Sequence, residues 1–181
     1  MKKTLNFIVA ASIMLFFTSC GGDSSNKEEK MTADEAYEKL TQIEEEVLGP
    51  NNAVSQSKLM ELMTEAQNFH KNYYDDKRVP SALQKGIRAA VSLKQYNKAI
   101  DMIDVLIKDY ATDKTAPEYL FQKAFIYGES GWFGEADKLY EQVISNYPKH
   151  PLAEQAKAAR EMLTMSDEEI IKKLENAQPV Q

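Results

Sequence analysis

The sequence predicts an all-α domain in which antiparallel helix pairs repeat along the chain and stack as a solenoid, with about three units and then closing helices. Pro80, Pro117 and Pro151 each open a helical pattern, at spacings of 37 and 34 residues. Proline suits the first turn of a helix because the missing N–H has no partner there. A period of this length indicates a helical repeat. The alternating pattern of half-buried strands does not occur in the chain.

Residues 1–19 have the composition of an export signal. Lys2 and Lys3 form a basic start, and an apolar run extends from Leu5 to Phe17. A membrane-spanning helix needs roughly 20 apolar residues, and this run is shorter. The segment is therefore predicted to be a removable leader rather than a permanent span.

The tetrapeptide Phe17-Thr18-Ser19-Cys20 follows this run. It resembles the lipobox of bacterial lipoproteins, although Phe17 stands where leucine is usual. The resemblance implies cleavage before Cys20 and a covalent lipid anchor on its thiol, and stable anchoring then needs several acyl chains. The alternative is an unlipidated secretory signal. Residues 20–31 have almost no apolar side chains and are expected to form a flexible tether.

Charge and cysteine content limit the partners and the source of stability. Loss of the leader would remove Lys2 and Lys3 and leave 20 basic against 28 acidic residues, a formal charge of −8. Such a surface argues against nucleic acid as a partner. Cys20 is the chain's one cysteine, so an intrachain disulfide is excluded and the domain must rely on its hydrophobic core.

The first unit is predicted over residues 32–79. Thr32 and Glu35 have the spacing of a capping box at a helix start. The sequence Gly49-Pro50-Asn51-Asn52 is typical of a turn. Ala66, Phe69, His70 and Tyr73 repeat the pattern of the second helix of the later units.

Two better-defined units follow, over residues 80–116 and 117–150. In both, a first helix with an apolar face leads through a short turn to a second helix that begins with an inward-facing alanine, Ala99 or Ala136. A small residue at that position lets two antiparallel helices approach closely. The inner positions are Leu83, Ile87, Ala90, Ala99, Ile103 and Leu106 in one unit, and Leu120, Ala124, Tyr127, Ala136, Tyr140 and Val143 in the other. Three extra residues are expected in the linker after the earlier unit.

Residues 151–177 are predicted to form two closing helices. The first has small and apolar residues at Ala153, Ala156, Ala159 and Met162, and the second starts at Ser166 and carries Ile170, Ile171 and Leu174. A repeat array exposes its last apolar face unless a terminal helix with a polar outer side covers it.

The best-defined unit resembles the tetratricopeptide repeat through Ala124, Tyr127, Gly131, Ala136, Tyr140 and Pro148. The match is weaker over residues 80–116, where Ile87, Ala90 and Ala111 replace the usual small residue, aromatic and proline. The resemblance implies a right-handed stack of helix pairs whose concave face is lined by the first helix of each unit.

Catalysis and cofactor binding are not expected. His70 occupies a packing position, His150 lies in a linker, and neither has a metal-motif partner in the sequence. The Gly128, Gly131 and Gly134 series lacks the preceding strand and following lysine of a phosphate loop. We therefore expect no enzyme, no metal and no cofactor other than the lipid on Cys20.

A partner protein or peptide segment is the expected ligand. If the repeat register holds, the groove side of the first helices presents Gln84, Arg88, Glu118, Phe121, Phe125, Leu152 and Gln155, with Ala159 as a further candidate. Phe121 and Phe125 could instead pack against a neighbouring unit, and Trp132 could cover the end of a helix pair or make contacts. Arg88 is the one basic residue at the positions of a terminal-carboxylate clamp, which disfavours that mode and favours a segment with apolar residues.

The lipobox and the helical repeats together resemble BamD-like lipoproteins of the outer-membrane β-barrel assembly machinery and other periplasmic repeat proteins. The short sequence Ile107-Lys108-Asp109-Tyr110 is of the kind found in those lipoproteins. Those lipoproteins have about five repeats. The resemblance implies a scaffold in the cell envelope. Gly21 favours the outer membrane, because it is not the aspartate that retains lipoproteins in the inner membrane. Whether the domain faces the periplasm or the cell surface stays open, since acidic residues after the cysteine can direct surface export in Bacteroidota. An accessory subunit of an envelope enzyme and a self-associating structural protein are the alternatives.

Overall fold

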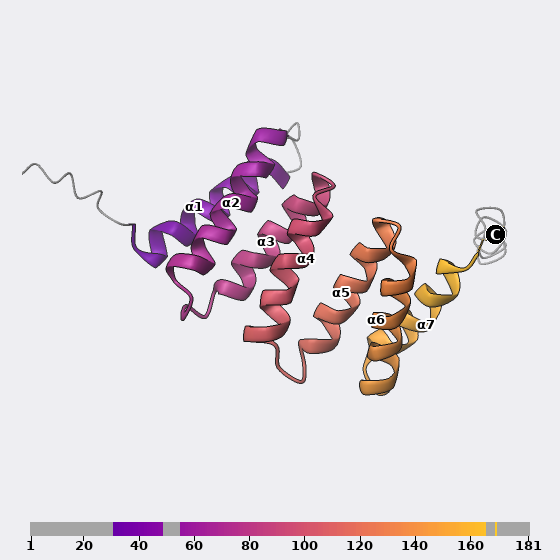
Figure 1. Cartoon of the computed structure of the whole chain (residues 1–181). Coiled ribbons are helices and arrows are strands. Elements are labelled where there is room, and N and C mark those ends of the chain that lie inside the picture. Colours follow the sequence, from indigo (N-terminus) through magenta and orange to yellow (C-terminus); the bar gives the residue numbers. More distant parts are fainter. Residues whose placement is uncertain (1–30, 49–54, 166–168, 170–181) are drawn as a thin grey trace, which may run out of the picture. The chain divides into compact units, whose positions relative to one another are not determined.

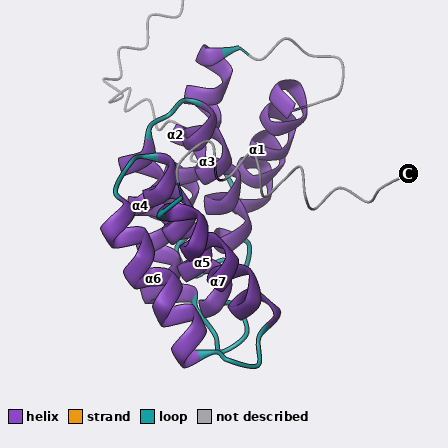
Figure 2. Cartoon of the chain, turned by 90° about the vertical axis from the view of Figure 1, so that its right-hand side faces the viewer, coloured by secondary structure: helices purple, strands orange, loops and turns teal. Residues whose placement is uncertain are grey.

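The computed structural model describes residues 31–48, 55–165 and 169, and within these ranges regular structure is entirely helical (Figure 2). The helices are α1 (Ala33–Leu48), α2 (Gln56–Asn72), α3 (Val79–Ser92), α4 (Tyr96–Val105), η1 (Leu106–Tyr110), α5 (Ala116–Glu129), α6 (Phe133–Asn146) and α7 (Pro151–Leu163). The predicted all-α class is confirmed.

The helices pack as sequential antiparallel pairs, which confirms the predicted architecture. Each helix lies beside the next one in the chain, from α1 to α7 (Figure 1), and the contacts are most extensive between α2 and α3 and between α5 and α6. Contacts between α4 and α5 are sparser. Among α-helices that follow one another in the chain, α4 and α5 therefore have the smallest interface.

Local sequence explains where the helices begin. The Thr32 amide donates to the Glu35 carboxylate at 2.8 Å and the Glu35 amide donates to the Thr32 hydroxyl at 3.3 Å, so the predicted capping box forms at α1. Proline lies in the first turn of α3, α5 and α7. Thr112 and Thr115 make an equivalent reciprocal pair before α5, which was not predicted.

Both turns within the later helix pairs contain one residue with a left-handed backbone. This residue is Lys94, with φ of 56°, between α3 and α4, and Gly131, with φ of 82°, between α5 and α6. The two residues occupy equivalent positions, because the proline-to-proline spacing of these units is also 37 residues. The turn geometry therefore repeats although the residue type does not.

The extra residues of the longer unit lie after its second helix, as predicted, because Tyr110 and Tyr147 still have the spacing of 37 residues and the chain from Tyr110 to Pro117 is longer than that from Tyr147 to Pro151. The second helix ends in a π-helical turn, η1, before the connection at residues 111–115. The Tyr110 hydroxyl at the end of this turn donates to the Tyr74 carbonyl at 2.7 Å, which ties η1 to the connection before α3.

The buried side chains form two cores. The first core is built mainly from α1 to α4 and also takes in Tyr119 and Ile126 of α5. The second core lies among α5, α6 and α7, around Ala124, Ala136, Tyr140, Val143 and Ala156. Helix α5 thus contributes opposite faces to both cores.

Several predicted segments lie outside the described residues. These are the leader at 1–19, Cys20 with the tether, the turn at 49–52, and the second closing helix predicted from Ser166, apart from Glu169.

Among the described helices, none combines the length and the apolar composition that crossing a bilayer requires.

Candidate functional site

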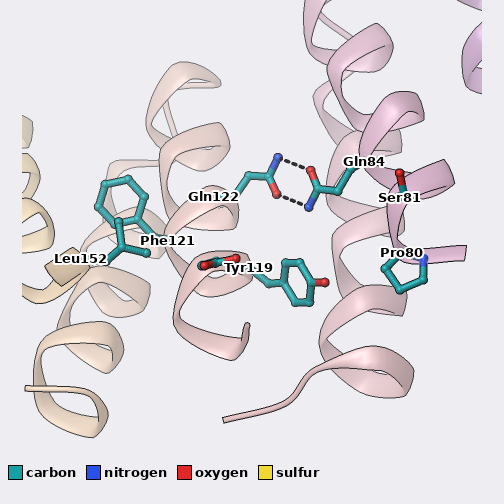
Figure 3. Close-up of a pocket in the computed structure, with 8 residues that line it drawn as sticks. Pro80, Ser81, Gln84, Tyr119, Phe121, Gln122 and Leu152 are labelled. Carbon is teal, nitrogen blue, oxygen red and sulfur yellow. Dashed lines mark hydrogen bonds between the residues drawn. The ribbon is translucent and has the colours of Figure 1, made fainter. Parts of the chain in front are cut away.

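A pocket of about 590 Å³ lies where the first helices of successive units, α3, α5 and α7, come together. We call it the groove, and its lining consists of Pro80, Ser81, Gln84, Glu118, Tyr119, Phe121, Gln122 and Leu152 (Figure 3). Four of the seven predicted partner-binding residues belong to this lining: Gln84, Glu118, Phe121 and Leu152. The volume falls within the range of about 300–1,000 Å³ that is common for ligand sites.

The two glutamines bridge the groove from opposite helices. Gln84 Nε2 on α3 donates to Gln122 Oε1 at 2.9 Å, and Gln122 Nε2 on α5 donates back to Gln84 Oε1 at 3.1 Å (Figure 3). A carboxamide has two N–H donors and an oxygen with two lone pairs, and this pair uses one of each per residue. Both side chains therefore keep one donor and one acceptor site for a ligand.

Phe121 and Leu152 form the apolar side of the groove and lie beside each other in Figure 3. The Phe121 ring also packs edge-on against Tyr140, with ring centroids 5.2 Å apart. Phe121 and Leu152 are both partly buried against the second core. Phe121 therefore lines the groove while its ring packs on Tyr140 of its own unit.

Glu118 supplies the negative charge of the groove. Its side chain is exposed, and among the described residues it has no cationic partner. The neighbouring Tyr119 is buried, which raises the pKa of its hydroxyl and keeps it protonated. The groove is therefore apolar on one side, neutral and hydrogen-bonding in the middle, and acidic at Glu118.

The other three predicted binding residues do not line the groove. Arg88 hydrogen-bonds through Nη2 to Glu44 of α1, which also pairs with the buried Lys85, so its charge is used within the array. Phe125 is 48% exposed on α5, and Gln155 is exposed on α7. Ala159, the further candidate, packs partly buried against the second core.

Pro80, Ser81, Tyr119 and Gln122 complete the groove and were absent from the predicted set. The repeat spacing aligns Gln84 with Phe121, whereas its actual partner is Gln122, 38 residues away. Register alone therefore could not have paired the two glutamines.

The histidines have structural contacts. His70 lies with its ring 6.0 Å from that of Tyr110, as expected for a packing residue. His150 is not simply a solvated linker residue: its Nδ1 accepts the Leu152 amide at 3.3 Å and caps α7. Among the described residues, no cluster of three or more His, Cys, Asp or Glu side chains could hold a metal ion.

Trp132 remains at the surface. It is 62% exposed, and its ring lies 6.4 Å from that of Tyr127. The indole therefore covers the end of the helix pair only in part, and most of it is free for contacts.

Comparison with known proteins identifies one repeat. Residues 117–150, which span α5, α6 and the connection to α7, match the tetratricopeptide repeat family. No curated protein matches the chain. The chain thus contains a tetratricopeptide repeat in an all-helical array, a kind of domain that typically mediates protein–protein interactions and is usually non-catalytic.

Proposed function

We propose that the chain is a non-catalytic interaction module of the cell envelope, which binds an extended segment of a partner protein in the groove. The observation that carries the proposal is the groove itself. It combines apolar side chains, amides with unused hydrogen-bonding capacity and an unpaired carboxylate on the face made by the first helices. The tetratricopeptide repeat at 117–150 supports the same class of function.

The chemistry of the groove specifies the bound segment. Backbone N–H and C=O groups of an extended peptide match the free donor and acceptor of Gln84 and Gln122. An apolar side chain fits against Phe121 and Leu152, and a lysine or arginine next to it meets Glu118. We therefore propose an apolar residue beside a basic residue as the recognised feature.

Tethering is the second part of the proposal. Residues 1–19 act as an export signal, and acylation of Cys20 anchors the array to a membrane, with the outer membrane favoured. The lipobox-like tetrapeptide supports this. A role in outer-membrane protein assembly follows from the resemblance to BamD-like lipoproteins and is the most specific form of the proposal.

The anchor is tested by Cys20→Ser with a clickable fatty acid supplied to the cells. Serine offers no thiol to acylate, so labelling of the chain should be lost and the leader should stay attached, as seen by mass spectrometry. Labelling equal to that of the unchanged chain would remove lipidation at Cys20 from the proposal.

The groove is tested by photo-crosslinking in intact cells. A photoreactive amino acid at Glu118 should capture a partner chain, and the same amino acid at Gln142, exposed on α6 and outside the groove, serves as the control. Equal capture at both positions would contradict a groove-specific contact. A crosslink between two copies of this chain would favour the self-associating alternative.

A charge reversal separates the groove from the rest of α5. Glu118→Lys should reduce capture by a crosslinker placed at Ser81, because the basic residue of the segment would then meet a like charge. Glu129→Lys makes the same charge change at the other end of the helix, outside the groove, and should leave capture unchanged. Both residues are exposed, so both variants should melt like the unchanged chain. Capture that survives Glu118→Lys would overturn the assignment of the acidic side.

A further inference from the structure

A second pocket lies at the edge of the array, between the turn that joins α3 to α4 and the turn that joins α5 to α6. We call it the edge pocket; it has a volume of about 440 Å³ and is lined by Lys94, Gln95, Tyr96, Asn97, Lys98, Ser130 and Trp132. It shares no residue with the groove. Its size suits one small ligand.

The lining of the edge pocket includes two aromatic residues. Trp132 is 62% exposed, and Tyr96 at the start of α4, which is partly buried against the first core, adds a second ring. Tyrosine and tryptophan combine a large apolar face with a polar group, and such residues suit contacts that are partly apolar and partly wet. The exposed indole face can therefore receive a flat or ring-shaped ligand.

The lining of the edge pocket also includes two cationic residues. Lys94 and Lys98 are exposed, and neither has an ion-pair partner among the described residues. The chain as a whole carries a formal charge of −6. Two unpaired lysines in one pocket therefore form a locally positive site on a protein of negative net charge. An anionic group on the ligand would complement them.

Lys94 also has a backbone conformation that does not favour a side chain. Its φ of 56° matches the position that glycine fills at Gly131 in the following unit. Glycine would relieve the backbone there, whereas lysine keeps an ammonium group at the pocket. The chain thus carries a long cationic side chain at a position where the backbone alone would favour glycine.

The remaining walls are mostly polar. The side chains of Gln95 and Asn97 have no hydrogen-bond partner among the described residues, and the Ser130 hydroxyl, which donates to the Tyr127 carbonyl at 3.0 Å, can still accept. A polyhydroxylated ligand can satisfy such groups, whereas an apolar peptide side chain cannot.

We propose that the edge pocket binds an acidic saccharide. One sugar ring stacks on Trp132, its hydroxyl groups bond to Gln95 and Asn97, and its carboxylate is held by Lys94 and Lys98. The site is independent of the groove, so the array would engage a partner chain and an acidic sugar through different surfaces.

Trp132 is the one tryptophan of the chain and reports directly on the pocket. The full chain in detergent is titrated with cellobiouronate and with cellobiose, which lacks the carboxylate. The proposal requires a saturable change in indole emission with the acidic disaccharide, affinity at least about fivefold weaker for the neutral one, and weakening by salt. No saturable change with cellobiouronate, or equal affinity for both sugars, would overturn it.

Two variants distinguish a binding role from a structural one. Lys94→Gly and Lys98→Gln should each weaken cellobiouronate binding about two- to fivefold, and Lys94→Gly should at the same time raise the melting temperature because it relieves the backbone. Lys157→Gln on α7, outside the pocket, makes the same charge change and should alter neither cellobiouronate binding nor the melting temperature. Unchanged binding by Lys94→Gly and Lys98→Gln together would overturn the role of the lysines.

A lipid headgroup is the competing source of anionic chemistry. Glycerophosphoglycerol is soluble and carries the phosphate without acyl chains, so it can be titrated under the same conditions. Tighter binding of this probe than of cellobiouronate would overturn the assignment to a saccharide and place the edge pocket against lipid headgroups instead.

Discussion

At the scale of single residues, two turns of the array each contain one residue with a left-handed backbone. Lys94 and Gly131 have the same place in successive units and similar positive φ values. A left-handed backbone costs an L-residue roughly 1–2 kcal/mol because its Cβ crowds the following carbonyl, whereas glycine has no Cβ. Introducing glycine at Lys94 should therefore stabilise the fold, and introducing a side chain at Gly131 should destabilise it.

We expect Lys94→Gly to raise the free energy of unfolding by about 1 kcal/mol and Gly131→Ala to lower it by about 1 kcal/mol. A Cβ at Gly131 would meet nothing within 4 Å, so the cost comes from the backbone alone. Gly134→Ala is the control, since that residue lies within α6 and also has open space around it. Urea unfolding measures all three. Equal effects of Gly131→Ala and Gly134→Ala would contradict the backbone explanation.

Glu44 is a residue whose charge supports the fold. Burial would raise its pKa, but hydrogen bonds and attraction from Lys85 and Arg88 outweigh burial, and the pKa lies below its ordinary value of 4.5. A lowered carboxylate pKa contributes stability above the unfolded value, and that stability is lost as the pH falls through the folded value. The contribution is therefore complete at neutral pH and disappears below pH 4.5.

Glu44→Gln should lower the free energy of unfolding at pH 7 by about 1–3 kcal/mol, because it leaves the buried Lys85 without its anion. Between pH 5 and pH 3 the variant should lose less stability than the unchanged chain. Asp76, with a pKa lowered to about 2 by Arg78, titrates in both chains and cancels in the comparison. Urea unfolding across this pH range gives both slopes, and parallel slopes would show that Glu44 titrates alike in the folded and unfolded states.

At the scale of helices, close approach in the unit at 80–116 depends on a small residue that the repeat pattern does not identify. Ile87 stands where the repeat usually has a small residue and is buried as predicted, whereas the small residue in the close contact is Gly86, one position earlier. A Cβ at Gly86 would lie 2.7 Å from the Cβ of Ala66 on α2 and 2.9 Å from the Met102 sulfur on α4. Helix α3 can therefore sit between α2 and α4 only because Gly86 has no side chain.

Gly86→Ala should consequently destabilise the array by about 1–3 kcal/mol, although alanine is the better helix former by roughly 1 kcal/mol. Met102 can move its flexible end, but Ala66 can move only with its helix. Gly128→Ala in α5 is the matched variant, because its Cβ would make an ordinary contact of 3.5 Å with Leu163. Thermal melting followed by circular dichroism should show the two variants shifting in opposite directions. A stabilised Gly86→Ala variant would refute the close packing.

The elements also show what sequence could predict. Prolines and the Thr32–Glu35 capping box marked helix starts, because both act through local backbone geometry. The Gln84–Gln122 pair was not foreseen, because it depends on how neighbouring units meet in space, and no sequence pattern predicted the π-turn at η1. Periodicity indicated a shared face for Gln84, Glu118, Phe121 and Leu152, which line the same groove. The pairing of Arg88 with Glu44 of another unit could not be inferred from periodicity.

At the scale of the described array, stability is divided between two cores of unequal size. The first joins α1 to α4, and the second is smaller and lies among α5, α6 and α7. In stacked repeats each unit is stabilised by itself and by its nearest neighbours, so parts of an array can open separately. Helix α5 joins the two, with Tyr119 in the first core and Ala124 in the second.

The groove crosses this division. Gln84 belongs to the side of the first core, whereas Phe121 and Leu152 pack on the second. A segment bound across the groove would contact both sides and would be lost whenever the smaller core opened. Binding should therefore raise the protection of the second core more than that of the first, because a ligand that binds the closed form stabilises it.

Hydrogen exchange tests this division directly. Amides in α6 and α7 should exchange through openings of lower free energy than amides in α2 and α3, because fewer buried side chains hold them. Val143→Ala, which removes two buried methyl groups from the second core, should lower protection in α6 and α7 by about 1–3 kcal/mol and leave α2 and α3 unchanged. Ile103→Val, a smaller deletion in the first core, is the reciprocal variant and should act mainly on α3 and α4. If either variant lowered protection evenly from α1 to α7, α5 would couple the two cores into one cooperative unit, and the groove would then report on the stability of the whole array rather than on its second core.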